Sequence, residues 1–267
     1  MKMLLQRLAV TLVLAAAMVS ANAAGPILDQ VAKSGELRVG MSGSQPPYNT
    51  ISRDGKLIGL DVDLANLIAS GLRVDLKIVQ MPFGDLVKAL EDGKVDMVMS
   101  GMAITTKRTQ KVSFVGPYML SGKSILTRSS VLAAAQEAGE IDDANLTVAA
   151  LAGSTSEEYV ETVMPLAKLV AVKDYDDGVK LLLDGKVDAM VADMAICLLT
   201  ILRHPDAGLS TLKSPFTFEP IGIAVPRNDP QFLNLIDNFV DVAEDIGALE
   251  RMRKKWLEDG SWVVALP

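Results

Sequence analysis

An internal repeat constrains the fold of this chain more than any other feature. Residues Val87–Ala103 read VKALEDGKVDMVMSGMA, and residues Val179–Ala195 read VKLLLDGKVDAMVADMA. In each copy a helical segment stops at the glycine of a Gly-Lys-Val-Asp motif, because glycine readily adopts the left-handed conformation found at helix ends. A short apolar run with the length of a buried strand follows. The repeat therefore predicts a helix-then-strand unit that occurs twice in the fold.

The two strands of the repeat end at equivalent positions, which Gly101 and Asp193 occupy. Ligands bind at the carboxyl ends of strands in open parallel sheets, so both residues are candidates for a binding site. A charge at the end of an apolar run needs a partner, which favours a role for Asp193. The alternative is that the repeat only reflects a recurring way of packing a helix on a strand.

The rest of the chain alternates strands and helices, which is typical of an α/β fold. Hydrophobic patterning predicts strands at residues 36–41, 74–80, 123–127, 147–151, 169–172 and 221–225. Helices are expected at residues 61–70, 85–92, 157–164, 230–245 and 248–257, with Asp61 as a candidate N-cap of the first. Residues 129–143 have the weakest pattern and are expected to form a surface helix or loop.

Residues 1–23 have the order of a secretory signal peptide rather than of folded structure. Lys2 and Arg7 precede an apolar stretch at residues 8–19, and Ala21-Asn22-Ala23 matches a cleavage site. The stretch is shorter than the roughly 20 residues of a membrane-spanning helix, although an uncleaved anchor is the alternative. We therefore expect an exported protein, most simply a periplasmic one.

Composition argues against several classes of function. The chain of 267 residues has a formal net charge of −7 and 4% aromatic residues, whereas nucleic-acid binding needs a basic face and stacking rings. A single cysteine, Cys197, and a single histidine, His204, support neither an internal disulfide nor a Cys/His zinc site. We expect no nucleic-acid partner, no metal and no cofactor.

Several segments, taken in order, give the chain a specific resemblance to a known family. They include SGSQPPY at residues 42–48, GLDVDLA at 59–65, AITTKR at 103–108, LAGSTSEEYV at 151–160 and VDAMVADMA at 187–195. The chain resembles the extracytoplasmic solute-binding proteins of ABC importers, in particular the polar amino-acid-binding family with the type II periplasmic binding protein fold. The resemblance covers nearly all of the chain after the signal peptide.

This resemblance implies two lobes, each a central sheet flanked by helices, joined by two crossover strands that act as a hinge. The first lobe would comprise residues 24–121 with 219–267, and the second residues 122–218, with crossings near 122–126 and 220–225. A small ligand would bind in the cleft, and the lobes would close on it. The implied partners are an amino acid or a related carboxylate and an ABC permease, and we expect a monomer.

The resemblance also implies roles for individual residues at the cleft. Arg108 matches the arginine that binds the ligand α-carboxylate, and a guanidinium suits such a two-pronged contact. Asp193 matches the partner of the α-amino group. The backbone N–H of Thr155, after Ser154 at a helix N-terminus, would meet the carboxylate. The remaining implied contacts are Gly101 and Ala103 to the amino group and Phe83 against the ligand side chain.

Three positions depart from the family pattern. Ala103 replaces a hydroxyl residue, Gln45 stands where the second clamp aromatic often lies, and Ser42 stands where binders of cationic ligands often carry Asp. Together they argue against Arg, Lys or His as the ligand and favour a carboxylate with a smaller or polar remainder. By residue type alone Arg108 would be a surface residue and Phe83 a core residue, so both roles depend on the motif.

Two other functions are compatible with the same fold. A few relatives are dehydratases that act on cyclic acids, which need a further acid or base at the cleft. Glu157 and Glu158 follow the Gly-Ser-Thr loop, but they are more simply explained as surface acids at a helix N-terminus. A sensory module would normally be fused to a membrane span and a signalling domain. We therefore expect a binding protein rather than an enzyme.

Overall fold

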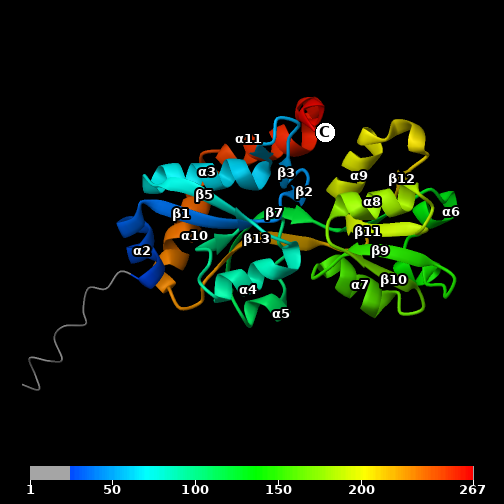
Figure 1. Ribbon diagram of the computed structural model, residues 1–267, viewed down its shortest axis with the longest axis horizontal. Helices are drawn as coiled ribbons and strands as arrows, with labels where there is room; N and C mark the ends of the chain where they lie inside the picture. Colours follow the sequence, from blue (N-terminus) through cyan, green and yellow to red (C-terminus); the bar gives the residue numbers. More distant parts are fainter. Residues whose placement is uncertain (1–24, 267) are drawn as a thin grey trace, which may run out of the picture.

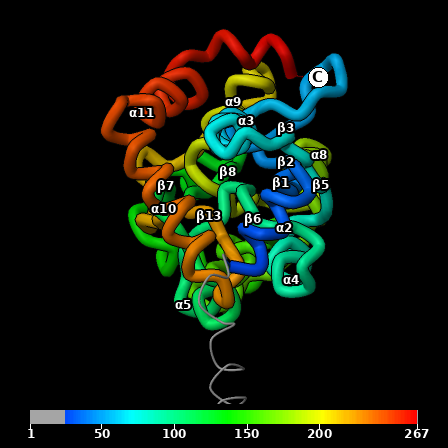
Figure 2. Tube along the Cα trace, turned by 90° about the vertical axis from the view of Figure 1, so that its left-hand side faces the viewer, coloured from blue at the N-terminus to red at the C-terminus, as the bar shows by residue number. Residues whose placement is uncertain are grey.

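The computed structural model describes residues 25–266, which form two α/β bodies, each built on a five-stranded sheet (Figure 1). The first sheet has the strand order β5-β1-β6-β13-β7, and Figure 2 shows this body end on, with β5 on the right and β7 on the left. The second sheet has the order β10-β9-β11-β8-β12. The predicted α/β class is confirmed. The predicted signal peptide lies outside the described residues.

The two sheets repeat one pairing scheme. In the first sheet β1 pairs in parallel with β5 and β6, and β13 pairs antiparallel with β6. In the second sheet β9 pairs in parallel with β10 and β11, and β8 pairs antiparallel with β11. The first sheet comprises β1 (Glu36–Met41), β5 (Asp75–Gln80), β6 (Met97–Val98), β7 (Ser113–Ser121) and β13 (Glu219–Val225). The second comprises β8 (Lys123–Thr127), β9 (Thr147–Leu151), β10 (Lys168–Val172), β11 (Ala189–Asp193) and β12 (Ser210–Thr211).

Helices lie on both sides of each sheet, as Figure 1 shows. Above the first sheet in that view are α3 (Leu60–Leu72) and α11 (Ala248–Arg253), and below it are α4 (Leu86–Glu91) and α5 (Thr106–Thr109). Above the second sheet are α8 (Tyr175–Leu183) and α9 (Met194–Arg203), and below it is α7 (Thr155–Val163). The other helices are α2 (Pro26–Ser34), α6 (Ser130–Ala133) and α10 (Pro230–Asp245), and a small sheet contains β2 (Ser44–Gln45), β3 (Asn49–Ile51) and β4 (Leu57–Ile58). Over residues 25–266, every helix is too short or too polar to cross a bilayer.

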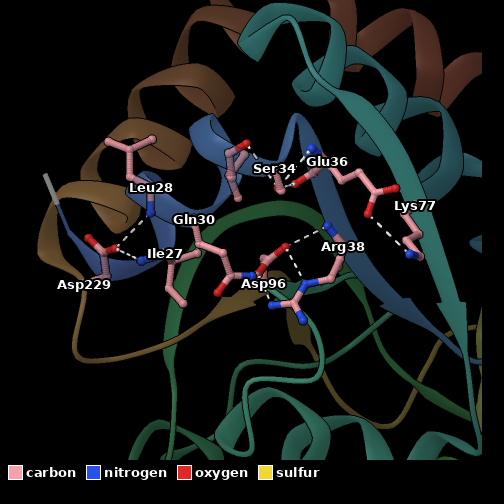
Figure 3. Close-up of polar contacts among 10 residues, drawn as sticks. Ile27, Leu28, Gln30, Ser34, Glu36, Arg38, Lys77, Asp96 and Asp229 are labelled. Carbon is pink, nitrogen blue, oxygen red and sulfur yellow. Dashed lines mark hydrogen bonds and ion pairs between the residues drawn. The ribbon is translucent and has the colours of Figure 1, made fainter.

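The sequence repeat has the same backbone geometry in both bodies. Gly93 and Gly185 end their helices with φ of 68° and 67°. The aspartate of each motif then joins its strand to the neighbouring parallel strand, β1 in the first sheet and β9 in the second. Asp96 exchanges two 2.8 Å hydrogen bonds with the backbone of Arg38, and Asp188 exchanges two of the same length with Thr147. Only Asp96 also forms an ion pair, with the Arg38 guanidinium, at 2.6 Å (Figure 3).

The chain passes between the two bodies beside Gly122. Strand β7 of the first sheet ends at Ser121, and β8 of the second sheet begins at Lys123. The chain returns between β12 and β13, so Glu219 begins the last strand of the first sheet opposite Ser121. The ends of strands from both sheets therefore meet at one junction. The exact division into lobes at residues 121/122 and 218/219 stays a prediction.

Three local expectations need correction. The helix predicted from Asp61 begins at Leu60 with Gly59 as N-cap, because the Asp61 carboxylate is buried and bonds to other parts of the first body. The helix predicted to reach residue 257 changes at Lys254 to a π-helical turn. Strand β7 was not predicted, because Gly116 and Pro117 interrupt its pattern. Proline is tolerated there because β7 is an edge strand.

Candidate functional site

The guanidinium of Arg108 connects the two bodies. Arg108 lies on α5, whose N-cap residue Thr105 accepts a hydrogen bond from its backbone N–H at 3.2 Å. Nη1 donates to the Ala103 carbonyl at 2.8 Å, and Nη2 donates across to the Gly153 carbonyl of the second body at 3.2 Å. Burial lowers the pKa of Arg108, yet an arginine remains charged at neutral pH. Within residues 25–266 its hydrogen-bond partners are carbonyls rather than carboxylates.

Phe83 lies beneath this guanidinium. The Arg108 Cζ atom lies 5.4 Å from the centre of the Phe83 ring, which is a cation–π contact. Phe83 is buried in one apolar cluster with Leu151 and Tyr175 of the second body. The aromatic ring therefore holds the guanidinium in place and packs the two bodies together. Its predicted contact with a ligand side chain stays a prediction.

Asp193 has a cationic partner that the sequence analysis did not identify. Lys123 lies directly opposite Asp193 in the antiparallel β8–β11 pair. Its Nζ lies 2.5 Å from Asp193 Oδ1 and 2.9 Å from Glu219 Oε2. The Lys123 and Asp193 side chains are only 3% and 5% exposed. The carboxylate assigned by resemblance to a ligand ammonium thus already binds an ammonium of the protein.

Glu219 joins this ion cluster to both bodies. Its Oε2 accepts a hydrogen bond from Thr155 Oγ1 at 2.8 Å, and its Oε1 accepts one from Thr217 Oγ1 at 3.3 Å. Burial alone would lower the pKa of Lys123, but Asp193 and Glu219 more than offset it, so this pKa lies above the ordinary lysine value of 10.5. Lys123 is therefore an ammonium ion at neutral pH.

Ser154 and Thr155 open helix α7. Ser154 is its N-cap, and the hydroxyl accepts hydrogen bonds from two backbone N–H groups of the first turn. Glu157 accepts a hydrogen bond from the Gly153 N–H at 2.7 Å, and Glu158 lies 3.7 Å from Lys107. These contacts give both glutamates structural partners. The Thr155 side chain contacts Glu219, whereas the proposed role of its backbone N–H stays a prediction.

Gly101 belongs to a polar network inside the first body. Its N–H donates to Asp61 Oδ2 at 2.9 Å, and Asp61 also accepts hydrogen bonds from Asn49 at 2.8 Å and from the Tyr118 hydroxyl at 2.5 Å. Burial raises the pKa of Asp61. Because these donors come from separate segments, the network ties β3, β7 and Gly101 to the first turn of α3.

Gln45 and Ser42 extend the same network. The Gln45 side chain is buried, and its Oε1 accepts hydrogen bonds from Ser100 at 2.7 Å and from Ser42 at 3.2 Å. An aromatic clamp residue is therefore replaced by an amide with partners inside the first body.

Tyr48 is a further candidate that the sequence analysis missed. It is fully buried, and its ring lies against Gly101, where a Cβ atom would come within 2.7 Å of Tyr48 Cδ2. Its hydroxyl has no hydrogen-bond partner among the described residues. Burial, with the charge of Asp193 nearby, raises the pKa of Tyr48. The hydroxyl is therefore a neutral donor near the ion cluster.

The predicted residues thus fall into three connected groups. Arg108, Phe83 and Ala103 form a guanidinium site together with the loop before Ser154. Asp193 reaches Thr155 through Lys123 and Glu219, whereas Gly101 and Gln45 lie in the Asp61 network. One sequence signal could have found Lys123: it is the one charged residue at the start of the otherwise uncharged strand KSILT.

A mostly apolar groove of about 420 Å³ adjoins the junction. Its lining includes Tyr48, Gly122 and Met194, with the exposed side chains of Leu120 and Phe218 at its rim. Neither Arg108 nor Asp193 lines it. The groove is thus adjacent to the charged site and chemically unlike it.

Comparison with known proteins supports the same fold. Residues 37–259 match the family of bacterial extracellular solute-binding proteins, family 3. The chain belongs to this family. The solute-binding protein is 30% identical over 255 residues to cyclohexadienyl dehydratase of Pseudomonas aeruginosa, covering 96% of this chain and 94% of that relative. It is 25% identical over 226 residues to ABC transporter arginine-binding protein 1 of Escherichia coli, covering 83% and 90%.

Solved structures agree with these relatives. An ancestral amino acid-binding protein, described as a precursor of cyclohexadienyl dehydratase, superposes on the solute-binding protein with a TM-score of 0.79 and 30% identity, covering 86% of this chain and 99% of that one. A mutant of ArgBP from T. maritima gives a TM-score of 0.82 and 31% identity, covering 87% and 100%. The predicted family and two-lobed periplasmic binding protein fold are confirmed.

Proposed function

We infer that this solute-binding protein captures a small carboxylate-bearing solute between its two bodies, in the periplasm, and delivers it as a monomer to an ABC permease. The observation that carries this proposal is the placement of Arg108. Its guanidinium sits where the two bodies meet, fixed by carbonyls on either side and by the Phe83 ring. Family members named for arginine, cystine and glutamate binding support the transport role.

The chemistry of the guanidinium suits a carboxylate. Arginine has five N–H donors, and Arg108 spends one on Ala103 and one on Gly153. The remaining donors can form a charge-assisted, two-pronged contact with an anion. Because one of the fixing carbonyls belongs to each body, an anion bound here would be enclosed from both sides. Hydrogen bonds to charged groups contribute about 1.5–3 kcal/mol each, so a few contacts account for micromolar affinity.

A ligand screen tests this proposal. Residues 24–267 would be screened by thermal shift against amino acids, 2-oxo acids, hydroxy acids and dicarboxylic acids, and each hit would be measured by calorimetry. Arg108→Met should weaken binding of every hit by roughly 100-fold or more, since at least two charge-assisted hydrogen bonds are lost. Lys107→Met, at the exposed neighbouring position, is the matched control. Undiminished affinity in Arg108→Met would contradict the proposal.

A dehydratase activity is the second candidate. It is favoured by the relative that covers 96% of this chain, together with the buried Asp193 carboxylate and the partly buried Glu219 carboxylate beside Lys123. Elimination of water requires a proton donor for the departing hydroxide, and these three side chains are ionisable groups at the junction. Incubating the protein with hydroxylated cyclohexadienyl carboxylic acids and following aromatic product by absorbance decides between the two. Turnover would establish an enzyme, and binding without turnover would support the transport role.

A further inference from the structure

The Lys123–Asp193 pair changes what the site can recognise. In the resemblance-based assignment Asp193 binds the α-amino group of an amino acid. Here the Lys123 ammonium contacts that carboxylate at 2.5 Å and is itself 3% exposed. The protein therefore supplies from its own chain the positive charge that an amino-acid ligand would bring.

We propose that Lys123 is a specificity-determining residue that makes this site select carboxylates without an α-amino group, such as 2-oxo, 2-hydroxy or dicarboxylic acids. The inference rests on the proposed function, because it takes Arg108 as the partner of the ligand carboxylate. Arg108 is assigned to the carboxylate of the ligand, whereas Lys123 acts on the group at its α-position.

Strand register fixes Lys123 in this position. Lys123 and Asp193 are direct partners across β8 and β11, so the sheet pairing holds their Cα atoms opposite each other. Glu219 holds the same ammonium from the other side at 2.9 Å, and Thr155 and Thr217 occupy its oxygens. The ammonium is thus held by two carboxylates from two different strands. It is a built-in group rather than a flexible surface side chain.

A second ammonium at Asp193 would be repelled by Lys123 and would have to share the Asp193 and Glu219 carboxylates with it. Like charges a few ångströms apart repel each other strongly when both are shielded from water. The Lys123 and Asp193 side chains are only 3% and 5% exposed, so a second ammonium beside them would be shielded too. An α-amino group brought to this place would also lose its own hydration without gaining an unshared carboxylate. A ligand with an oxygen at the α-position avoids both costs.

Tyr48 supplies a suitable partner for such an oxygen. Its hydroxyl is buried, lies near the charge of Asp193 and the Ser121 side chain, and makes no hydrogen bond of ordinary geometry in the described part of the chain. A neutral hydroxyl can donate to a keto or hydroxyl oxygen. Ala103, which lacks the hydroxyl that the family uses for the amino group, is consistent with the same ligand class.

Calorimetry with paired ligands tests the role of Lys123. The pairs would be alanine and pyruvate, leucine and 4-methyl-2-oxopentanoate, phenylalanine and phenylpyruvate, and glutamate and 2-oxoglutarate. In every pair that binds, the wild-type protein should bind the oxo acid at least 10-fold more tightly, which corresponds to about 1.4 kcal/mol. Lys123→Met should reduce or reverse this preference, whereas Lys123→Arg should retain it. Lys173→Met, which removes an exposed lysine paired with Asp177, is the matched control.

The outcomes separate the two proposals. Failure of every carboxylate to bind would contradict the proposed function and this inference together. Wild-type protein that binds an amino acid as tightly as its oxo partner would overturn the role of Lys123 while leaving the proposed function intact. If circular dichroism shows that Lys123→Met does not fold, the wild-type pairs and Lys123→Arg decide: a lost preference in Lys123→Arg overturns the inference, because that variant keeps the charge.

Discussion

Gly153 and Gly84 lie so close across the two bodies that a Cβ atom added to Gly153 would come within 2.7 Å of the Gly84 Cα. Real Cβ atoms do not approach a backbone atom this closely, so one of the two loops would have to move. The Gly153 carbonyl is also the group that receives Arg108 Nη2. The spacing of these two glycines therefore sets how near the second body can come to the guanidinium.

Gly153→Ala should weaken ligand binding by about 10-fold or more, because the added methyl group keeps the two loops apart. Both Gly153 and Gly185 have positive φ, at 74° and 67°, so alanine at either position costs roughly 1–2 kcal/mol of stability. Gly185 has no atom within 4 Å of an added Cβ, which makes Gly185→Ala the matched control. Calorimetry and urea unfolding would be measured on both. Equal affinity in the two variants would show that the close approach is not needed.

The two aspartates of the repeat should differ in their contribution to stability. Asp96 is fully buried and pairs with Arg38, so Asp96→Asn should cost about 3 kcal/mol, because the Arg38 guanidinium loses its charged partner. Asp188 is exposed and accepts one backbone hydrogen bond, so Asp188→Asn should cost about 1 kcal/mol. Urea unfolding followed by circular dichroism measures both. A larger loss of unfolding free energy in Asp188→Asn than in Asp96→Asn would show that burial does not cause the difference between the two aspartates.

The ammonium of Lys123 should stabilise the fold up to alkaline pH. Its pKa in the folded protein lies above 10.5, so its contribution is fully present below that ordinary value and is lost as pH rises through the higher folded pKa. The difference in unfolding free energy between wild type and Lys123→Met should stay constant from about pH 8 to about pH 10 and then shrink. Urea titrations at constant ionic strength check this. A difference that falls steadily below pH 10 would place the pKa lower than the contacts imply.

Cys197 should resist thiol reagents in the native state. Burial raises its pKa to about 12, so very little thiolate exists at mildly alkaline pH, and the sulfur is enclosed. Reaction with a disulfide reagent should be slow for the native protein and fast after addition of denaturant. Rapid native labelling, at a rate independent of denaturant, would show that the thiol is accessible.

The sequence specifies much of this fold because most elements carry their own pattern. Strands at residues 36–41, 123–127 and 147–151 occur where period and composition place them, and Gly93 and Gly185 end their helices as expected. These features depend on neighbours along the chain. The edge strand β7 depends instead on a distant segment. Its Gly116-Pro117 step resembles a turn until pairing with β13 is known.

The candidate site was harder to predict, because its charges are paired across the chain. Motifs made Arg108 and Asp193 candidates, but the cation that binds Asp193 comes from Lys123, 70 residues earlier. Only the antiparallel register of β8 and β11 sets them opposite each other. Asp61 shows the converse error: its place before a helical pattern suggested a cap, whereas tertiary contacts from Asn49 and Tyr118 decide its role.

The passage of the chain at Gly122 has a mechanical consequence for the ion cluster. In any rotation of one body against the other, atoms move in proportion to their distance from the axis, and Lys123 and Glu219 each lie at the first residue of a strand leaving that passage. These charges would stay together in a rotation whose axis passes beside Gly122. The ion cluster would then already be formed while the two bodies are still apart. Selection among solutes would therefore not have to wait until the bodies close.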